Sequence, residues 1–246
     1  MSADPKKPEP SASFTKYEGR SSSAMSLTRV PRVSYQASAT RRSQHRATNL
    51  PVSADFENGF GDEPEYVAET IRLAADAGLV GCTIEDAMKD KDNPIYPFEA
   101  VVARIEATVA AADALGFAFY LTRRCENFLP GNTDLDDTIR RLKAYEDAGV
   151  KVLMASGLPD LEAVKTVCSA LSTPFNFMVG IPGRSCDVAS LQASGVRLIS
   201  LAPAIYRSAM QAVVGAATEA RDQGTFGFVE TVLPSLDLSG SMKSHG

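Results

Sequence analysis

The chain has 246 residues, of which 44% are hydrophobic and 22% charged, and this size predicts one folded domain with a substantial core. No run approaches 18 apolar residues, so we expect no membrane-spanning segment. Residues 1–50 carry nine Lys/Arg against three Asp/Glu, so the rest of the chain has 16 Lys/Arg against 27 Asp/Glu and is acidic. This disfavours a nucleic-acid partner, because neutralising phosphates requires clustered Lys/Arg.

The first 48 residues are rich in Ser, Arg and Pro, and their apolar residues follow neither a helical nor a strand period. We expect residues 1–48 and 231–246 to be disordered and residues 49–230 to form the folded domain, because the tails cannot bury enough apolar area to offset the entropy of ordering them. The stretch Met25–Leu50 lacks acidic residues, as a mitochondrial transit peptide does, but Asp4 and Glu9 precede it. A cytoplasmic location is therefore expected, with a mitochondrial one as the alternative.

From Leu50 onward, short β-favouring runs alternate with amphipathic helices, which is typical of a β/α protein. The predicted strands are Pro51–Asp55, Val80–Asp86, Ala118–Thr122, Lys151–Ser156, Phe175–Gly180 and Val196–Leu201. The predicted helices cover residues 64–77, 97–115, 134–148, 159–171, 186–194 and 203–222.

The helix ends support a parallel sheet. Gly78, Gly149 and Gly195 each follow a predicted helix and precede an apolar strand, where a glycine supplies the left-handed cap. At the opposite ends, Pro64 fits the first turn of its helix, Thr133 or Asp134 can cap the third, and Pro159-Asp160 opens the fourth. Repeated units of similar length favour a TIM-type (β/α) barrel over an open doubly wound sheet, although six strands are two fewer than a closed barrel needs.

Acidic and arginine side chains stand at the ends of the first three strands or directly after them: Asp55, Glu57, Glu85, Asp86, Arg123, Arg124 and Glu126. Because the carboxyl ends of parallel strands meet at one edge of a sheet, we expect these side chains to converge there. The only histidines, His45 and His245, lie in the tails, which disfavours His-ligated zinc and Ser-His-Asp hydrolysis. Ligation by oxygen alone suits Mg²⁺, or Mn²⁺, and an adjacent arginine offers a bidentate clamp for an anionic oxo or hydroxy acid.

Each of these residues also has a structural interpretation. An acidic residue at a strand end can cap the next helix, and the two arginines can form salt bridges to helices. Asn176 on the fifth strand can face the same edge or be buried in the wall. Cys125 can act as a nucleophile or pack as a small residue, Cys82 is expected in the core, and the glycines of Gly59-Phe60-Gly61 can cradle phosphate or merely form a turn.

Three segments, Ala54–Gly61, Gly81–Asp86 and Leu121–Phe128, resemble successive motifs of the isocitrate lyase and phosphoenolpyruvate mutase superfamily, and the likeness runs from about Leu50 to about Gln223. The resemblance implies a TIM-type barrel and a Mg²⁺-dependent lyase or mutase, in which the metal stabilises an enolate of a small 2-oxo acid while a C–C or P–C bond is made or broken. In this superfamily the last helix is often exchanged between subunits, so a homo-oligomer formed through Phe226–Val229 is one expectation and a frayed tail is the alternative.

The resemblance assigns roles residue by residue. Asp55 falls where the family has its direct Mg²⁺ ligand, and Glu57 and Glu85 where acidic residues hold the waters of the metal. Arg124 falls where an arginine binds the substrate carboxylate, and we expect Glu126 and Asn176 to join it in binding the substrate.

Two departures bear on specificity. The loop Asp86–Tyr96 has neither the Cys nor the His of the lyase branch, and Ser156 stands where those lyases keep a glutamate, so isocitrate or methylisocitrate cleavage is not expected. The chain is more similar to the phosphonomutase-like branch, in which Asn93 would be the substrate-facing residue of the loop.

A third departure bears on activity. Residues 1–48 do not resemble the two β/α units with which family members begin, so we expect an N-terminally incomplete barrel that is weakly active or inactive unless another chain completes it. The alternative function is therefore a catalytically impaired remnant. An open-sheet cofactor-binding module is disfavoured, because no G-x-G-x-x-G follows a strand.

Overall fold

The computed structural model describes residues 50–234 and residue 237, so the predicted N-terminal tail and most of the predicted C-terminal tail lie outside the described residues. Six parallel strands form one sheet in the order of the sequence, which confirms the predicted β/α architecture. The strands are β1 (Ser53–Asp55), β2 (Gly81–Glu85), β3 (Tyr120–Cys125), β4 (Val152–Ala155), β5 (Phe175–Met178) and β6 (Leu198–Ser200).

Each strand leads into a helix close to the predicted position. The helices are α2 (Pro64–Asp76), α3 (Phe98–Asp113), α4 (Leu135–Asp147), α5 (Leu161–Ala170), α6 (Val188–Ala193) and α7 (Ala204–Gln223), followed by a 3₁₀ turn, η1 (Gly227–Thr231), which was not predicted. Asp134 and Asp160 cap α4 and α5 by accepting hydrogen bonds from backbone N–H groups in the first turn. Gly78, Gly149 and Gly195 all have positive φ, which confirms the glycine caps.

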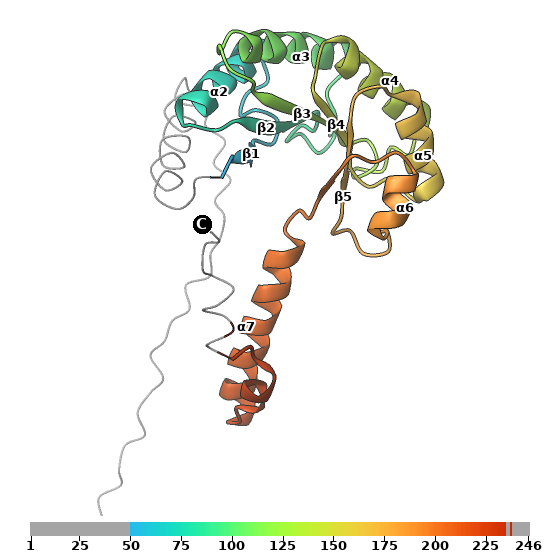
Figure 1. Ribbon diagram of the computed structural model, residues 1–246. Coiled ribbons are helices and arrows are strands. Elements are labelled where there is room, and N and C mark those ends of the chain that lie inside the picture. Colours follow the sequence, from blue (N-terminus) through green and yellow to red (C-terminus); the bar gives the residue numbers. More distant parts are fainter. Residues whose placement is uncertain (1–49, 235–236, 238–246) are drawn as a thin grey trace, which may run out of the picture.

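The sheet curls like part of a barrel wall, with α2 to α6 along its convex side (Figure 1). Successive residues of a strand point to opposite faces of a sheet. Cys82, Ile84 and Leu121 are buried in the core between sheet and helices, which confirms the prediction for Cys82. Residues that alternate with them, including Glu85 and Arg124, face the concave side. The site therefore lies on the hollow side of a curled six-stranded sheet.

One strand extends further than predicted. The sequence placed the third strand at residues 118–122, but β3 runs from Tyr120 to Cys125, so Arg123 and Cys125 belong to the strand instead of to a loop. Both side chains are buried on the helix-facing side. The prediction that Arg123 converges with Arg124 at the edge of the sheet was therefore wrong, whereas Cys125 packs as a small residue, as one of its two interpretations expected.

The last long helix is separate from the sheet. α7 has no buried residue and projects away from the curled sheet (Figure 1). Its apolar side chains Ile205, Tyr206, Val213 and Val214 are all more than half exposed. Across residues 50–234, α7 included, no helix has the length and apolarity that crossing a membrane requires.

Candidate functional site

Arg124 is the centre of the site. Its guanidinium forms ion pairs with carboxylates from three consecutive β/α units: Nη1 lies 3.0 Å from Oδ2 of Asp55, Nε lies 2.6 Å from Oε1 of Glu126, and Nη2 contacts Oε2 of Glu85. The strand register brings these groups together, because β2 and β3 pair Glu85 directly with Arg124. The sequence thus correctly predicted that these four residues, which we call the Arg124 cluster, converge at the ends of the strands.

Glu57 is held beside the cluster by its backbone. Its N–H donates to Oδ1 of Asp55 at 3.2 Å, and its carbonyl accepts from the N–H of Glu85 at 2.8 Å, so hydrogen bonds link the three acidic positions. Glu57 adopts a left-handed conformation with φ 52°, which costs a non-glycine residue about 1–3 kcal/mol. Its carboxylate is exposed and lies 3.3 Å from the ammonium group of Lys89.

The two glycines that follow are required by packing. A Cβ at Gly59 would lie 2.8 Å from Cγ1 of Val67, and one at Gly61 would overlap the side chain of Tyr66. Both contacts are with α2, and Gly59 also has φ 81°. This loop therefore needs glycine in order to fold closely over the start of α2, which is sufficient to explain the motif without a phosphate.

The charges of the Arg124 cluster do not balance. One guanidinium faces the carboxyl groups of Asp55, Glu85 and Glu126, which leaves a charge of −2 when all three are ionised. Within residues 50–234, no three His, Cys, Asp or Glu side chains gather closely enough to hold a metal ion by themselves. Mg²⁺ usually keeps several waters and takes only one or two carboxylates from the protein, so the all-oxygen donors beside this excess charge fit such an ion.

Glu126 is the most enclosed carboxyl group of the cluster. Burial raises its pKa, and this effect outweighs the opposing influence of Arg124 and of the hydrogen bond from Ser156. Oγ of Ser156 donates to Oε1 of Glu126 at 2.8 Å. Ser156, which stands where the lyase branch keeps a glutamate, therefore gives Glu126 a hydrogen-bond donor.

The two predicted asparagines occupy different surroundings. Asn176 lies on β5, where its Nδ2 is 3.7 Å from Sδ of Met154, a residue that pairs with Arg124 across β3 and β4. Its Oδ1 is buried and has no hydrogen-bond partner among the described residues. Asn93 is exposed and donates to Oδ2 of Asp90 at 3.1 Å, so the structure brings Asn176, but not Asn93, towards the concave side near the cluster.

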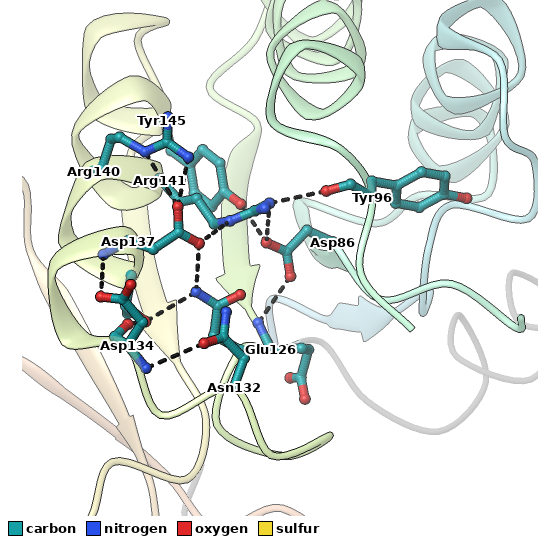
Figure 2. Close-up of polar contacts among 11 residues, drawn as sticks. Asp86, Tyr96, Glu126, Asn132, Asp134, Asp137, Arg140, Arg141 and Tyr145 are labelled. Atoms are coloured by element: carbon teal, nitrogen blue, oxygen red, sulfur yellow. Dashed lines mark hydrogen bonds and ion pairs between the residues drawn. The ribbon is translucent and has the colours of Figure 1, made fainter. Parts of the chain in front are cut away.

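Behind the cluster lies a buried polar network that the sequence did not reveal (Figure 2). Asp86, which is fully buried, accepts from the backbone N–H of Glu126 at 2.8 Å, from the hydroxyl of Tyr145 at 2.7 Å and from Nη1 of Arg141 at 3.4 Å. The sequence grouped Asp86 with the converging carboxylates. The alternation of side chains after Glu85 is the signal that places Asp86 on the opposite side, facing α4.

Arg141 extends the network along α4. Its Nε donates to Oδ2 of Asp137 at 2.8 Å, and Figure 2 shows the guanidinium between Asp137 and Asp86. Partial burial raises the pKa of Asp137, but hydrogen bonds from Arg141, Arg140 and Asn127 outweigh it and lower the pKa to about 2. Asp137 and Arg141 are therefore both charged at neutral pH, and the contacts of the network tie the loop after β3 to α4.

Arg123 is the remaining charge on the helix-facing side. It is fully buried, its Cζ lies 5.6 Å from the centre of the Tyr145 ring, and its guanidinium nitrogens have no hydrogen-bond partner among the described residues. Burial lowers its pKa, while Tyr145 and Asp86 oppose the shift. Arg123 is thus part of the core behind the site.

Comparison with known proteins adds a family to this geometry. Residues 22–221 match the family model described as phosphoenolpyruvate phosphomutase. This match begins 28 residues before Leu50, where the resemblance was expected to start, and therefore includes part of the segment that was expected to be unlike the family.

Individual relatives agree with this match. An oxaloacetate decarboxylase of Marinomonas sp. (strain MWYL1) is 26% identical over 200 residues, which cover 79% of this chain and 66% of that enzyme. A crystal structure from Burkholderia cenocepacia J2315, provisionally described as a lyase/mutase, is 46% identical with a TM-score of 0.79, and the match covers 89% of this chain and 77% of that one. The structure of 2,3-dimethylmalate lyase shares the fold, with a TM-score of 0.70 at 23% identity and coverage of 85% and 76%. The chain thus spans less than two thirds of the length of the Marinomonas enzyme.

Proposed function

Because this chain belongs to the phosphoenolpyruvate phosphomutase family, we propose that the Arg124 cluster binds a small 2-oxo or 2-hydroxy acid and serves a Mg²⁺-dependent lyase or mutase reaction, in which a C–C or P–C bond is broken or made. The observation that carries the proposal is the set of ion pairs between Arg124 and Asp55, Glu85 and Glu126 at the ends of neighbouring strands. The similarity to an oxaloacetate decarboxylase supports a dicarboxylic 2-oxo acid as the first substrate to test.

The residues of the cluster divide the work by chemistry. The planar guanidinium of Arg124 has the fork geometry that binds a carboxylate through two hydrogen bonds, and it is held by the carboxylates that surround it. Glu126 accepts a hydrogen bond from Ser156 and is ion-paired with Arg124, and burial raises its pKa, so it lies where it can contact a substrate held by Arg124. The buried Oδ1 of Asn176 offers an acceptor for a substrate hydroxyl.

Asp55, Glu57 and Glu85 would hold the metal ion, Asp55 directly and the two glutamates through water. A bound Mg²⁺ supplies charge stabilisation for an enolate oxygen. A metal ion would compete with Lys89 for the carboxylate of Glu57, because the two side chains form an ion pair.

A second candidate is a catalytically impaired member of the family. It is favoured by the present pairing of Asp55 and Glu85 with Arg124, because a guanidinium that already neutralises these carboxylates competes with a metal ion. In that case the site would bind Mg²⁺ feebly and an anionic substrate hardly at all.

Calorimetric titration with Mg²⁺ and oxalate, a mimic of the enolate, separates the two candidates. We expect each ligand to strengthen the binding of the other by the same factor, about 10- to 100-fold, because binding free energies are coupled reciprocally. Asp55→Asn should abolish the coupling, whereas Asp76→Asn at the end of α2 should leave it unchanged. Weak Mg²⁺ binding together with undetectable oxalate binding would favour the impaired member.

We also propose that α7 is exchanged between the subunits of a homo-oligomer. Its exposed apolar side chains have no cover within the described residues, and burying them against a second copy would recover the free energy of apolar contact. Val213→Glu should weaken self-association at least tenfold, since a charge would enter the apolar contact. Ala212→Glu, which adds the same charge at the preceding helix position, should have a smaller effect. Analytical ultracentrifugation of both variants measures self-association. A wild-type chain that stays monomeric at all concentrations would contradict the exchange.

A further inference from the structure

Arg104 binds the loop between β1 and α2 through the backbone of the loop. It lies in α3, is almost fully buried, and donates to three backbone carbonyls of that loop: Nη1 contacts Gly61 O at 2.7 Å and Asp62 O, and Nη2 contacts Asn58 O. Three carbonyls of one short segment thus share a single guanidinium. A planar group with several N–H donors in fixed directions is suited to this task, whereas an ammonium group is not.

Tyr96 completes the contact from the other side. Its ring lies over Arg104, with 4.2 Å between the ring centre and Cζ. Its hydroxyl accepts from Nδ2 of Asn58 at 2.9 Å and donates to Oδ1 of Asp62 at 2.7 Å. Two residues of the same loop are therefore bound a second time, through their side chains.

Tyr96 also belongs to the network behind the site. Its N–H donates to the carbonyl of Asp86 at 3.0 Å, and its carbonyl accepts from Nη1 of Arg141 at 3.1 Å. Figure 2 shows this carbonyl facing Arg141 while the ring extends the opposite way. The backbone of Tyr96 is fixed to the Asp86 network, and its side chain is fixed to the β1–α2 loop.

The loop itself is in a conformation that needs such support. Glu57 and Phe60 both have positive φ, at 52° and 63°, although neither is glycine. Residues in this region persist when their surroundings determine the backbone, and the carbonyls that Arg104 binds lie within the five residues that follow Glu57.

We propose that Tyr96 and Arg104 are positioning residues that hold the β1–α2 loop in the conformation that keeps the backbone of Glu57 beside Asp55 and Glu85, at the proposed metal position. This inference rests on the proposed function, because it assumes that Asp55, Glu57 and Glu85 serve a metal ion. In this proposal neither residue is a ligand of the metal or of the substrate, and each acts through the loop that carries Glu57.

The test uses Tyr96→Phe in the full chain, because phenylalanine keeps the ring over Arg104 and removes only the two hydrogen bonds of the hydroxyl. Mn²⁺ is the probe, and its paramagnetic resonance signal reports binding without turnover. We expect about 10-fold weaker Mn²⁺ binding, since loss of a group that orients metal ligands typically costs about 10- to 100-fold in affinity. Arg104→Lys, which retains the charge but not the fork, should weaken binding in the same direction.

Amide hydrogen exchange in the metal-free chain provides a second readout. The N–H groups of Gly59 and Glu85 donate to carbonyls of Phe56 and Glu57, and both should exchange faster in Tyr96→Phe. Val164→Ala, a buried change in α5, serves as the matched control for a general loss of stability and should alter neither the exchange of these two amides nor Mn²⁺ binding.

The outcomes are distinct. Unchanged exchange at Gly59 and Glu85 in Tyr96→Phe would show that no clamp exists. Faster exchange with unchanged Mn²⁺ affinity would show that the clamp does not position the metal ligands. A wild-type chain that binds no Mn²⁺ would instead overturn the proposed function, and with it the inference, before any variant is compared.

Discussion

Arg124→Met is expected to weaken oxalate binding about 30-fold or more at saturating Mg²⁺, because truncating one member of a buried charge pair costs about 2–5 kcal/mol and each ~1.4 kcal/mol is a factor of ten. The side chain is only 15% exposed, so water cannot replace the lost contacts efficiently. Turnover of any 2-oxo acid substrate should fall with the affinity, since the same guanidinium would hold the substrate carboxylate. Calorimetry and a coupled assay for oxaloacetate consumption measure the two effects.

The same substitution should change the binding of Mg²⁺ alone in the opposite direction. Without Arg124, Asp55 and Glu85 lose the cation that now neutralises them, and a divalent ion should bind as tightly as before or more tightly. Arg124→Lys should give an intermediate result, because it keeps the charge without the fork. Arg72→Met, which removes an arginine from an exposed pair on α2, is the control. If Arg124→Met binds oxalate as tightly as the wild type, Arg124 does not bind the substrate carboxylate.

Asp86→Asn is expected to cause the largest loss of stability, about 3–5 kcal/mol, because removing one partner of a buried charge pair leaves the other uncompensated. Asp86 is fully buried, and the change would remove a counter-charge that acts on the buried Arg123 and leave Arg141 paired with Asp137 alone. A loss of this size is a large part of the 5–15 kcal/mol that typically separates folded and unfolded chains. Urea unfolding followed by circular dichroism measures it.

Two further variants keep this prediction open to contradiction if Asp86→Asn does not fold. Tyr145→Phe removes one hydrogen bond to Asp86 and should cost about 1–2 kcal/mol. Asp136→Asn, an exposed position in the first turn of α4, should stay within about 0.5 kcal/mol of the wild type. Equal unfolding midpoints for Asp136→Asn and Tyr145→Phe would argue that the network contributes little.

The architecture was predictable because local signals repeat. Each predicted strand and helix has a counterpart near its expected position, and the glycines at 78, 149 and 195 adopt the positive φ that their places after helices required. The extent of β3 was not predictable. Arg123 and Arg124 read as a loop, since charged residues carry little strand signal, yet pairing with β2 on one side and β4 on the other extends the strand through both.

The acidic part of the site followed from strand order alone, but its support did not. Asp55, Glu85, Arg124 and Glu126 lie at strand ends, where a parallel sheet gathers side chains whatever their partners. Arg104 acts through contacts with backbone carbonyls and Tyr96 through contacts with side chains, all of them 34 to 46 residues away, and no sequence pattern reports such contacts. A partial signal existed: Arg104 shares the buried stripe of α3 with Val101, Ile105 and Thr108, which marks it as an arginine facing inward.

Arg123 and Arg124 are adjacent and identical in type, but they have unrelated roles. Because neighbouring side chains of a strand point to opposite faces, one arginine is committed to the interior and the other to the concave surface. Natural variation at the first position would be filtered by whether the chain folds, and at the second by what the proposed site must bind. Deletion of a single residue just upstream in β3 would turn each of the two side chains to the opposite face of the sheet. The sequence Arg-Arg would be unchanged, but the buried position and the concave position would each receive the wrong arginine.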